Sequence, residues 1–250
     1  MSFLKRDIRP LGRPLAVFDV DETLIWEKSM FSFLRFFLRS EHGWQAGDAK
    51  YKDICAALHS LSAIAPRETV NRAFYEVLKG QKMSHLQAQA EKWFAQIPAQ
   101  EWFIPEVLAT LRVHQQHGHR IALLSGSADF ILKPVCDVLA PDDVLAITLE
   151  QSEEGICTGQ IAGLQTIGAG KTAALQTILD DVDNDPIVSS FGYGDHESDA
   201  PFLAACDVGF VVTHRGSSKR PDWAQDFHPV FVDSSQKPTA SPQTESYANV

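Results

Sequence analysis

Two aspartates, Asp19 and Asp21, follow directly after the short apolar run Leu15–Phe18 in the stretch LAVFDVDETLIW. Residues two apart in an extended chain point to the same side, so both carboxylates can face one small volume beyond the end of a strand. Like charges this close repel each other unless a proton or a cation compensates them. Because Mg²⁺ prefers oxygen ligands and typically uses only one or two carboxylates, the stretch predicts a metal-assisted site.

A second pair of acids, Asp195 and Asp199, occurs in GDHESD after the apolar run at 187–192. With a helix beginning at Ser198, Asp195 lies in the preceding loop and Asp199 in the first helical turn. Asp199 has an ordinary alternative role as a helix N-terminal charge that complements the helix dipole. Four acids that converge from two strands favour a bound cation. The predicted metal ligands are Asp19, Asp21, Asp195 and Asp199.

Groups suited to an anion occur elsewhere in the chain. Ser125 lies in LLSGS at the end of another apolar run, and Lys171 lies in GAGKT ahead of a helical pattern. A hydroxyl, the backbone amides near Gly126 and an ammonium group together suit a tetrahedral dianion. Ser125 alone could equally be a helix N-cap. Taken with the acids, these residues predict a phosphomonoester substrate.

Strand and helix patterns alternate over most of the chain. Short apolar runs that stop at small or acidic residues lie at 15–18, 120–124, 187–192 and 208–212. Helical patterns lie at 105–117, 130–139 and 172–179. This alternation predicts an α/β fold with a Rossmann-like, mostly parallel sheet and helices on both faces. Ligands in such folds bind beyond the carboxyl ends of the strands, where the polar residues named above fall.

Residues 26–103 interrupt the alternation with helical patterns only. The predicted helices are at 28–41, 48–61, 67–79 and 84–96. We therefore expect residues 1–25 and 104–233 to form the α/β core domain and 26–103 to form an all-helical cap domain over the strand ends. The polar segment 234–250 is expected to be a disordered or surface-laid tail. Segments 148–150 and 156–161 could form a hairpin.

Two side-chain clusters have ordinary structural interpretations. His114, His117 and His119 lie at the predicted end of a helix, with Gly118 between the last two. They are interpreted as a solvated helix terminus. A group of aromatic residues near the start of the cap is interpreted as cap core, with a substrate-binding box as the alternative. Its members are Trp26, Phe31, Phe33, Phe36 and Phe37.

Composition excludes several classes of function. The formal net charge of −10 argues against general binding to nucleic acids or to an anionic membrane, both of which need a positive field. The most apolar segment, MFSFLRFFL, is far shorter than the roughly 20 residues that span a bilayer. The four cysteines form no CxxC pair, and the N-terminal residues lack an apolar signal region, so a reducing cytoplasm is expected. Either a monomer or a homodimer is compatible with the sequence.

The motifs FDVDETL, LLSGS, Lys171 and GDHESD occur in the order and contexts of the haloacid dehalogenase (HAD) superfamily. They resemble its phosphoserine-phosphatase-like branch, in which a helical cap follows the first motif. The resemblance covers roughly residues 14–213. DVDET is the most specific motif on its own, and the ordered set of four makes a chance match improbable.

The resemblance implies a role for each matching residue. Asp19 would be the nucleophile that forms an aspartyl phosphate, and Asp21 would protonate the leaving alkoxide and then activate water. Ser125 and Lys171 would hold the phosphoryl group. Asp195 would bind Mg²⁺ together with Asp19 and the backbone carbonyl of Asp21, with Asp199 supporting or completing the metal shell. Since a halide leaving group needs no proton, Asp21 favours a phosphatase over a dehalogenase.

Departures from the family pattern concern the substrate. The position nine residues after the nucleophile resembles a glutamate in phosphoserine phosphatases, but here it is Lys28, with Glu27 one place earlier. This departure argues against phosphoserine and suits an acidic or doubly phosphorylated substrate. The last motif carries His196 and Ser198 where those enzymes usually have smaller residues or an amide, and His196 is a possible substrate contact. The predicted substrate-binding residues are Ser125, Gly126, Lys171, Glu27, Lys28 and Ser198.

The sequence therefore predicts a Mg²⁺-dependent phosphatase of a small phosphorylated metabolite. An ATPase is improbable, because a P-loop ending in GAGKT needs its first glycine at position 165, which is Gln165. Two alternatives stay open. One is transfer of the phosphoryl group from the same intermediate to an alcohol, and the other is a catalytically silent binding protein that retains the fold.

Overall fold

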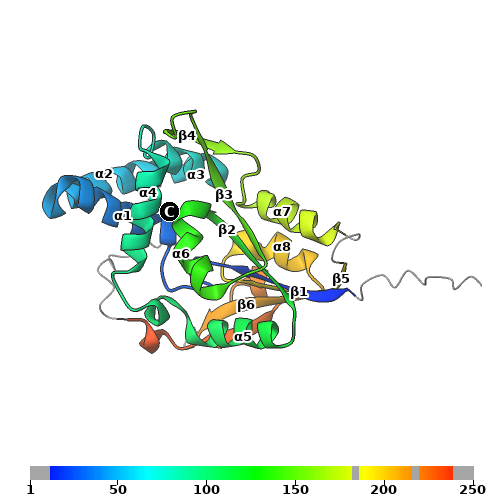
Figure 1. Cartoon of the computed structure of the whole chain (residues 1–250). Helices are drawn as coiled ribbons and strands as arrows, with labels where there is room; N and C mark the ends of the chain where they lie inside the picture. Colours follow the sequence, from blue (N-terminus) through cyan, green and yellow to red (C-terminus); the bar gives the residue numbers. More distant parts are fainter. Residues whose placement is uncertain (1–11, 182–185, 216–219, 239–250) are drawn as a thin grey trace, which may run out of the picture.

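The computed structural model describes residues 12–181, 186–215 and 220–238, and the account below is confined to them. A sheet of seven strands crosses the molecule in the order β4-β3-β2-β1-β5-β6-β7 (Figure 1). The strands are β1 Arg13–Asp19, β2 Arg120–Ala128, β3 Asp143–Gln151, β4 Cys157–Ala162, β5 Ile187–Gly194, β6 Val208–His214 and β7 His228–Val232. All neighbouring strands pair in parallel except β3 and β4. The predicted Rossmann-like α/β fold is confirmed.

Helices cover both faces of the sheet. The helices after the cap segment are α5 Pro105–Gln116, α6 Asp129–Leu139, α7 Ala169–Leu179 and α8 Ala200–Ala205. Side chains of β1 alternate between two apolar clusters: Ala16 and Phe18 pack with α5 and α6, whereas Leu15 and Val17 pack with α7 and α8. This alternation is what a strand buried on both faces requires.

The first and second strand of the chain are separated by a helical layer. It contains α1 Ser29–His42, α2 Trp44–Ser62, α3 Arg67–Glu76 and α4 Met83–Phe94. Residues 26–103 form no strand beyond isolated bridges at Lys82 and Phe103, in agreement with the four predicted helices. Figure 1 shows these helices together at one end of the sheet, beside β3 and β4. The exact limits of a cap domain stay a prediction.

The helical layer shares its apolar core with the sheet. Phe33 of α1 packs edge-on against Phe130 of α6, with ring centroids 5.5 Å apart, and against Trp93 of α4. One cluster of buried side chains runs from these residues to Phe18 of β1. Burying such aromatic surface strongly favours contact between the two layers. The cap helices are therefore packed directly onto the core through a shared apolar cluster.

The predicted hairpin is confirmed and fastens the cap from its other side. β3 and β4 pair antiparallel, with Thr148 opposite Ala162. The hairpin binds the α3–α4 connection through its backbone: Gly80 N–H donates to the Cys157 carbonyl, and Cys157 N–H donates to the Gln81 carbonyl, both at 2.8 Å. A motion of the cap would have to carry this hairpin with it.

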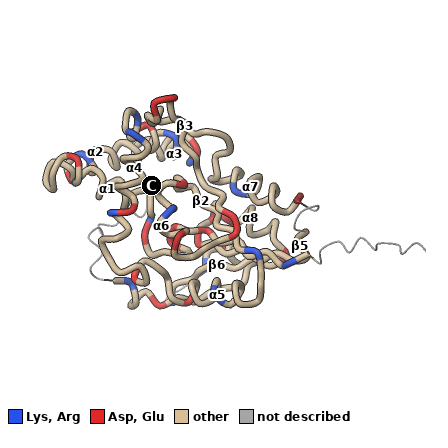
Figure 2. The backbone as a smooth tube through the Cα atoms, viewed as in Figure 1, with Lys and Arg blue, Asp and Glu red and all other residues tan. Residues whose placement is uncertain are grey.

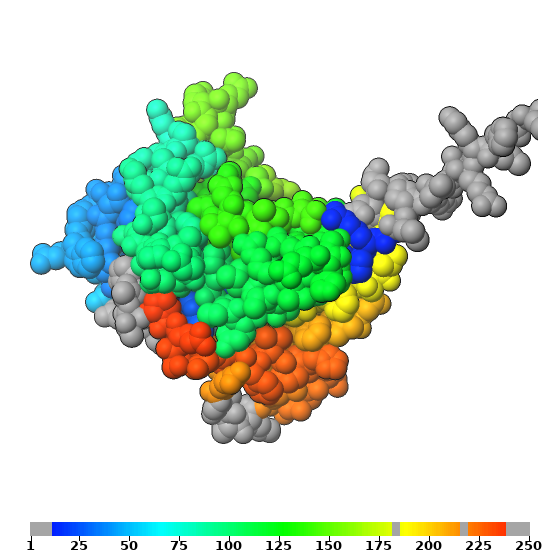
Figure 3. All heavy atoms as spheres, turned by 60° about the horizontal axis from the view of Figure 1, so that its bottom comes forward, coloured from blue at the N-terminus to red at the C-terminus, as the bar shows by residue number. Residues whose placement is uncertain are grey.

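Part of the expected tail is folded. Residues Ser234–Gln236 form a 3₁₀ turn, and Lys237 Nζ donates to the Trp26 carbonyl at 3.1 Å. The space-filling view shows this C-terminal stretch, in red, lying against the helices drawn in green and teal (Figure 3). Of the two alternatives expected for this tail, residues 234–238 follow the surface-laid one, while 239–250 lie outside the described residues. This stretch is held against the protein because the Lys237 ammonium binds the Trp26 carbonyl and the Glu27 carboxylate.

Acidic and basic positions are interspersed along the described chain, without a single basic stripe (Figure 2). None of the helices in the described ranges combines the length and apolar character needed to cross a bilayer.

The interpretation of the histidine cluster as a solvated helix end is wrong for His114. Its side chain is buried, only 8% exposed, because α5 turns it toward the sheet. One ring nitrogen lies 2.8 Å from the Tyr193 hydroxyl, and the other lies 2.7 Å from Nδ1 of His119. Tyr193 in turn stacks between Phe18 and Phe210. Burial, with the nearby His119 and His117, lowers the pKa of His114 to about 4.

This burial predicts an acid-labile fold. Below pH 6.5 the unfolded chain protonates at His114 before the folded chain does, so the stabilisation present above pH 6.5 is lost as the pH falls toward 4. When the pH falls from 7 to 5, the unmodified protein should lose unfolding free energy because of His114. The His114→Gln variant lacks this contribution, so its loss should be smaller by about 1–2 kcal/mol. Urea denaturation at the two pH values measures this. The exposed His59→Gln is the control and should follow the unmodified protein; equal losses in all three proteins would contradict the prediction.

Candidate active site

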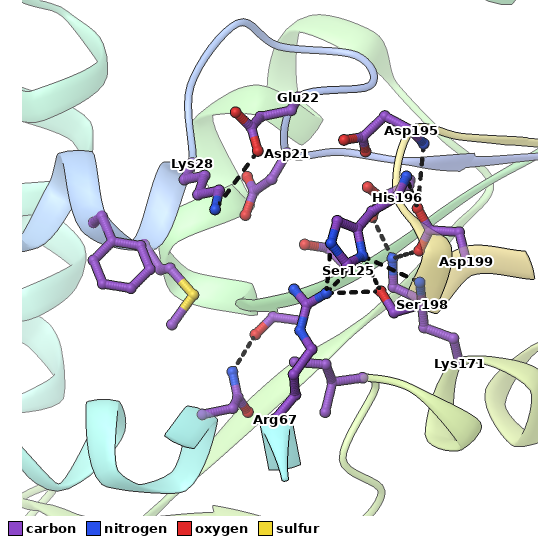
Figure 4. A pocket seen from close by; sticks show the side chains of 16 residues that line it. Asp21, Glu22, Lys28, Arg67, Ser125, Lys171, Asp195, His196, Ser198 and Asp199 are labelled. Carbon is purple, nitrogen blue, oxygen red and sulfur yellow. Dashed lines mark hydrogen bonds and ion pairs between the residues drawn. The ribbon is translucent and has the colours of Figure 1, made fainter. Parts of the chain in front are cut away.

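The six side chains predicted to do chemistry line a single cavity at the carboxyl ends of β1, β2 and β5. They are Asp19, Asp21, Ser125, Lys171, Asp195 and Asp199. The cavity encloses about 610 Å³ of empty volume, part of it open to solvent. The cap helices α1 and α3 supply part of the remaining wall (Figure 4). Sequence motifs up to 180 residues apart therefore meet where the sheet topology brings the strand ends together.

Lys171 joins two of the acids by buried ion pairs. Its Nζ lies 2.6 Å from Oδ1 of Asp19 and 2.7 Å from Oδ1 of Asp199, and all three side chains are almost fully buried. Burial alone would lower the pKa of Lys171, but the two carboxylates outweigh it and raise that pKa above its usual value. Burial raises the pKa of Asp19 to about 7 although Lys171 opposes the shift. The ammonium is thus the firmly charged group, and the ionisation of Asp19 depends on further positive charge nearby.

Asp199 also shapes the loop that carries Asp195. Oδ2 of Asp199 accepts hydrogen bonds from the backbone N–H groups of Asp195 (3.2 Å) and His196 (3.1 Å). A Cβ on Gly194 would lie 2.8 Å from the Asp199 side chain, so only glycine permits this approach. The helix N-terminal interpretation and the active-site interpretation of Asp199 both describe the structure: one oxygen caps the turn while the other holds Lys171.

Three carboxylates are arranged to hold a cation. One oxygen from each of Asp19, Asp195 and Asp199 falls within 4.8 Å of the others. Burial, with Asp19 and Asp199 beside it, raises the pKa of Asp195 well above its usual value. Three carboxylates face one ammonium here, and the excess negative charge together with the all-oxygen donor set fits a hard dication. The residues present therefore fit Mg²⁺.

The side chain of Asp21 is not part of this group, and the backbone carbonyl of Asp21 stays the predicted metal ligand at this position. Its Oδ1 accepts the backbone N–H of Ser29 at 3.0 Å, and its Oδ2 accepts the hydroxyl of Ser127 at 2.7 Å. The two serine hydroxyls are themselves 2.8 Å apart. Burial raises the pKa of Asp21 against the effect of these hydrogen bonds. A carboxyl group held in place with a raised pKa is suited to carry a proton into the cavity.

Ser125 and Gly126 lie opposite the acids at the end of β2. The Ser125 hydroxyl accepts the N–H of Ser127 at 3.0 Å, and Ser125 is not the N-cap of α6, which is Ala128. The Gly126 carbonyl accepts hydrogen bonds from Asn71 Nδ2 (3.1 Å) and the Tyr75 hydroxyl (2.9 Å), both on cap helix α3. These bonds tie the predicted phosphate-binding turn directly to the cap.

His196 and Ser198 face the cavity beside an arginine of the cap. Nη1 of Arg67, at the start of α3, lies 2.7 Å from Nδ1 of His196 and 3.0 Å from the Ser198 hydroxyl (Figure 4). Burial and the neighbouring Arg67 lower the pKa of His196, which suits the neutral ring as an acceptor for the guanidinium. Both residues line the cavity, so the geometry is compatible with substrate contact by either.

Glu27 and Lys28, both proposed from the sequence as substrate contacts, differ in position: only Lys28 lines the cavity. Lys28 lines the cavity and lies 3.8 Å from a carboxylate oxygen of Glu22, which lines it too. Glu27 is absent from the cavity wall; its carboxylate lies 3.6 Å from Nζ of Lys237. The prediction of Glu27 as a substrate contact therefore has no support in the geometry.

Three contributors were missed by reasoning from the sequence. Thr23 donates to Asp195 at 2.8 Å, Ser127 donates to Asp21, and Arg67 reaches the last motif from the cap. Thr23 and Ser127 each lie two residues beyond a predicted site residue, a spacing that could have indicated them. Nothing in the sequence around Arg67 signals its contact, because it depends on how the cap sits over the core.

The two glycines of GAGKT allow the backbone conformation and close packing at the start of α7. Gly168 has a φ of 53° at the start of α7, in the left-handed region that glycine occupies without strain. A Cβ on Gly170 would lie 1.8 Å from the Gln165 carbonyl oxygen. The turn is thus a close-packed entry into α7 that delivers Lys171 to the cavity.

The family model of haloacid dehalogenase-like hydrolases matches residues 16–204. This chain belongs to that family. The resemblance inferred from the four motifs is confirmed, and the HAD core described above is the fold that the match predicts. Its sequence relatives include the histidinol-phosphatase of Neisseria meningitidis serogroup C (strain 8013), 27% identical over 111 residues. That match covers 41% of this chain and 49% of the relative, so it spans about half the relative's length.

Solved structures with the same HAD fold include three at low sequence identity. A protein of unknown function from Bordetella pertussis Tohama I has a TM-score of 0.74 at 20% identity, covering 88% of this chain and 98% of its own. A HAD family hydrolase from Salmonella enterica serovar Typhi has a TM-score of 0.62 at 18% identity, covering 87% and 68%. A phosphoserine phosphatase with a phospho-aspartyl intermediate analogue has a TM-score of 0.58 at 16% identity, covering 80% and 87%. At these identities the likeness shows the fold.

The buried ion pairs predict that Lys171 stabilises the fold of the metal-free protein. Removing one partner from a buried pair leaves uncompensated charge, so Lys171→Met should lower the unfolding free energy by about 3 kcal/mol. The double variant Lys171→Met/Asp199→Asn should recover part of that loss. Urea denaturation at pH 7.5 in the presence of a chelator measures both. Lys133→Met, in an exposed ion pair with Asp137, is the control and should change little; a loss no larger at Lys171 than at Lys133 would contradict the assignment.

Proposed function

We propose that this HAD hydrolase is a Mg²⁺-dependent phosphatase that hydrolyses a phosphomonoester of a small metabolite through an aspartyl phosphate on Asp19. The observation that carries the proposal is the position of Asp19: it is buried, its Oδ1 is held by Lys171, and it faces the same cavity as Ser125. A positioned carboxylate beside fixed positive charge is what attack on a phosphoryl group requires. Phosphatases among the relatives support this class of reaction.

The residues that would hold Mg²⁺ are Asp19 and Asp195 with the backbone carbonyl of Asp21, while Asp199 would complete or support the shell and fixes the loop of Asp195. When bound, Mg²⁺ supplies positive charge that neutralises phosphoryl oxygens in the transition state. Lys171 and Ser125 bind the remaining oxygens of the transferring group. Lys171 also screens the charge of Asp19, which lowers the repulsion between the attacking carboxylate and the anionic phosphate.

Asp21 carries the protons of both half-reactions. In the first, an oxygen of Asp19 forms a bond to phosphorus, the bond to the substrate alkoxide breaks, and the alkoxide takes the proton of Asp21. In the second, Asp21 takes a proton from water as the water oxygen attacks phosphorus, and the bond to Asp19 breaks with release of phosphate. The hydrogen bonds from Ser29 and Ser127 hold Asp21 in place for both steps.

The residue at position 28 bears on the choice of substrate. The cation of Lys28 replaces the expected acid, but Glu22 at 3.8 Å offsets part of its charge. This pairing weakens the case for an acidic or doubly phosphorylated substrate that rested on Lys28 alone. The organic group must instead be accommodated by the cap side chains that complete the cavity.

Replacement of the nucleophile tests the proposal. Asp19→Asn should lower the rate of p-nitrophenyl phosphate hydrolysis in the presence of Mg²⁺ by at least about a thousandfold, because the amide cannot form the intermediate. The exposed Asp137→Asn is the matched control and should retain the full rate. Phosphate release with and without glycerol distinguishes hydrolysis from transfer to an alcohol. A fully active Asp19→Asn protein would overturn the proposed mechanism, and no turnover of any phosphoester would favour a silent binding protein.

The intermediate itself can be trapped. Acid quenching during turnover of a ³²P-labelled phosphomonoester should leave label on the protein, and hydroxylamine should release it, since an acyl phosphate is cleaved by that reagent. Asp19→Asn should carry no label. Label of equal amount in this variant would show that another residue accepts the phosphoryl group.

A further inference from the structure

A second cavity lies against the catalytic cavity on the side of the cap. It encloses about 460 Å³ of empty volume, part of it open to solvent. The two cavities share wall residues from α1, from α3 and from the turn before α7, so they are neighbours. The shared residues are Met30, Phe31, Arg67, Asn71 and Ile167.

The walls of the two cavities differ in chemistry. Five carboxylates line the catalytic cavity: Asp19, Asp21, Glu22, Asp195 and Asp199. Among the described residues, no carboxylate lines the second cavity, and six of its nine wall residues are apolar. Phe31 and Phe74 form one side of it, with ring centroids 5.3 Å apart in a T-shaped arrangement. Of its polar wall residues, Arg67 and Asn71 already bind other protein groups.

The loop between α2 and α3 forms the rim. Ser62 and Ala65 line the second cavity, and Ile64 between them is 85% exposed. Phe31 was interpreted from the sequence as cap core with the other aromatic residues. Phe33, Phe37 and Trp26 are buried in the core as predicted, whereas Phe31 lines both cavities, so the alternative of a substrate-binding role applies to this one residue.

We infer that the second cavity binds an apolar group, aromatic or aliphatic, on the organic part of the phosphomonoester, and that this group sets the substrate specificity. The inference rests on the phosphatase function proposed above. A phosphoryl group held by Ser125 and Lys171 leaves the rest of the substrate to extend toward the cap, where the second cavity begins. An apolar group gains free energy there by leaving water. In the part of the chain that the structure describes, Arg67 is the one charged residue of this wall, so an ammonium group would be disfavoured.

Matched phosphate esters test this specificity. The probes are 2-phenylethyl phosphate, 2-aminoethyl phosphate and ethyl phosphate, all esters of primary alcohols. We expect kcat/KM for the phenyl ester to exceed that for the ethyl ester by about tenfold or more, and the amino ester to be the poorest of the three. Equal values for the phenyl and ethyl esters, or a preference for the amino ester, would overturn the inference.

A paired substitution locates the effect. Ala65→Asp adds a carboxylate to the wall of the second cavity and should lower the phenyl-to-ethyl ratio of kcat/KM by about tenfold. Ala63→Asp places the same group on an exposed position outside both cavities and should leave the ratio unchanged. If Ala65→Asp does not fold, Val70→Thr, a change of similar volume in the same wall, takes its place with an expected several-fold fall. An unchanged ratio in the folded variant would overturn the inference.

Binding separates this inference from the proposed reaction. Calorimetry with 2-phenylethylphosphonate and ethylphosphonate, which cannot be hydrolysed, should show the same preference as the esters and the same loss in Ala65→Asp. Preferential binding of the phenyl compound without turnover of any ester would refute the phosphatase function and leave the inference about the cavity standing. Turnover of the esters without any preference would refute the inference and leave the phosphatase function standing.

Discussion

The structure depends on an imbalance of buried charge at the ends of the central strands. Asp19, Asp195 and Asp199 face a single ammonium group, that of Lys171; Asp19, Asp199 and Lys171 are almost fully buried, and Asp195 is half-buried. Carboxylates withdrawn from water are destabilised unless hydrogen bonds and cations compensate them. The hydrogen bonds from Thr23 and from the backbone of the Asp195 loop supply part of that compensation. The remaining negative charge is what makes the cavity suitable for a dication and, through it, for a phosphate.

The cap contributes to the site in two different ways. Its apolar core is continuous with that of the sheet through Phe33 and Phe130. Its backbone is also hydrogen-bonded to the β3–β4 hairpin, so the cap is attached to the core at two places. Its helix α3 supplies Arg67 and Asn71, which bind the motifs of the core. The same helix, with α1, forms the apolar wall of the second cavity. Because the cap is held in place, the side chains that would contact the organic part of a substrate are held in place too.

Local patterns were sufficient to predict the fold and most of the site. Apolar runs that end in acids or small residues identified β1, β2, β5 and β6, and helical periodicity identified the four cap helices. The grouping of the acids followed from parallel topology, since the carboxyl ends of β1, β2 and β5 lie at one edge of the sheet. The orientation of Asp21 could not be obtained this way, because it is decided by Ser29 and Ser127 from other elements. Burial of His114 and the contacts of Arg67 were equally invisible, since both arise only when distant segments pack.

The most direct test of the charge imbalance is the thermal stability of the protein and of Asp195→Asn, each with and without Mg²⁺. Asn keeps the oxygen that accepts from Thr23 but removes one half-buried negative charge. The account predicts that Mg²⁺ at saturating concentration raises the midpoint of the unmodified protein by about 5 °C or more. It also predicts that Asp195→Asn is more stable than the unmodified protein without metal and gains little from Mg²⁺. A variant that is less stable without metal, or that retains the full shift with Mg²⁺, would contradict a shared cation site formed by these acids.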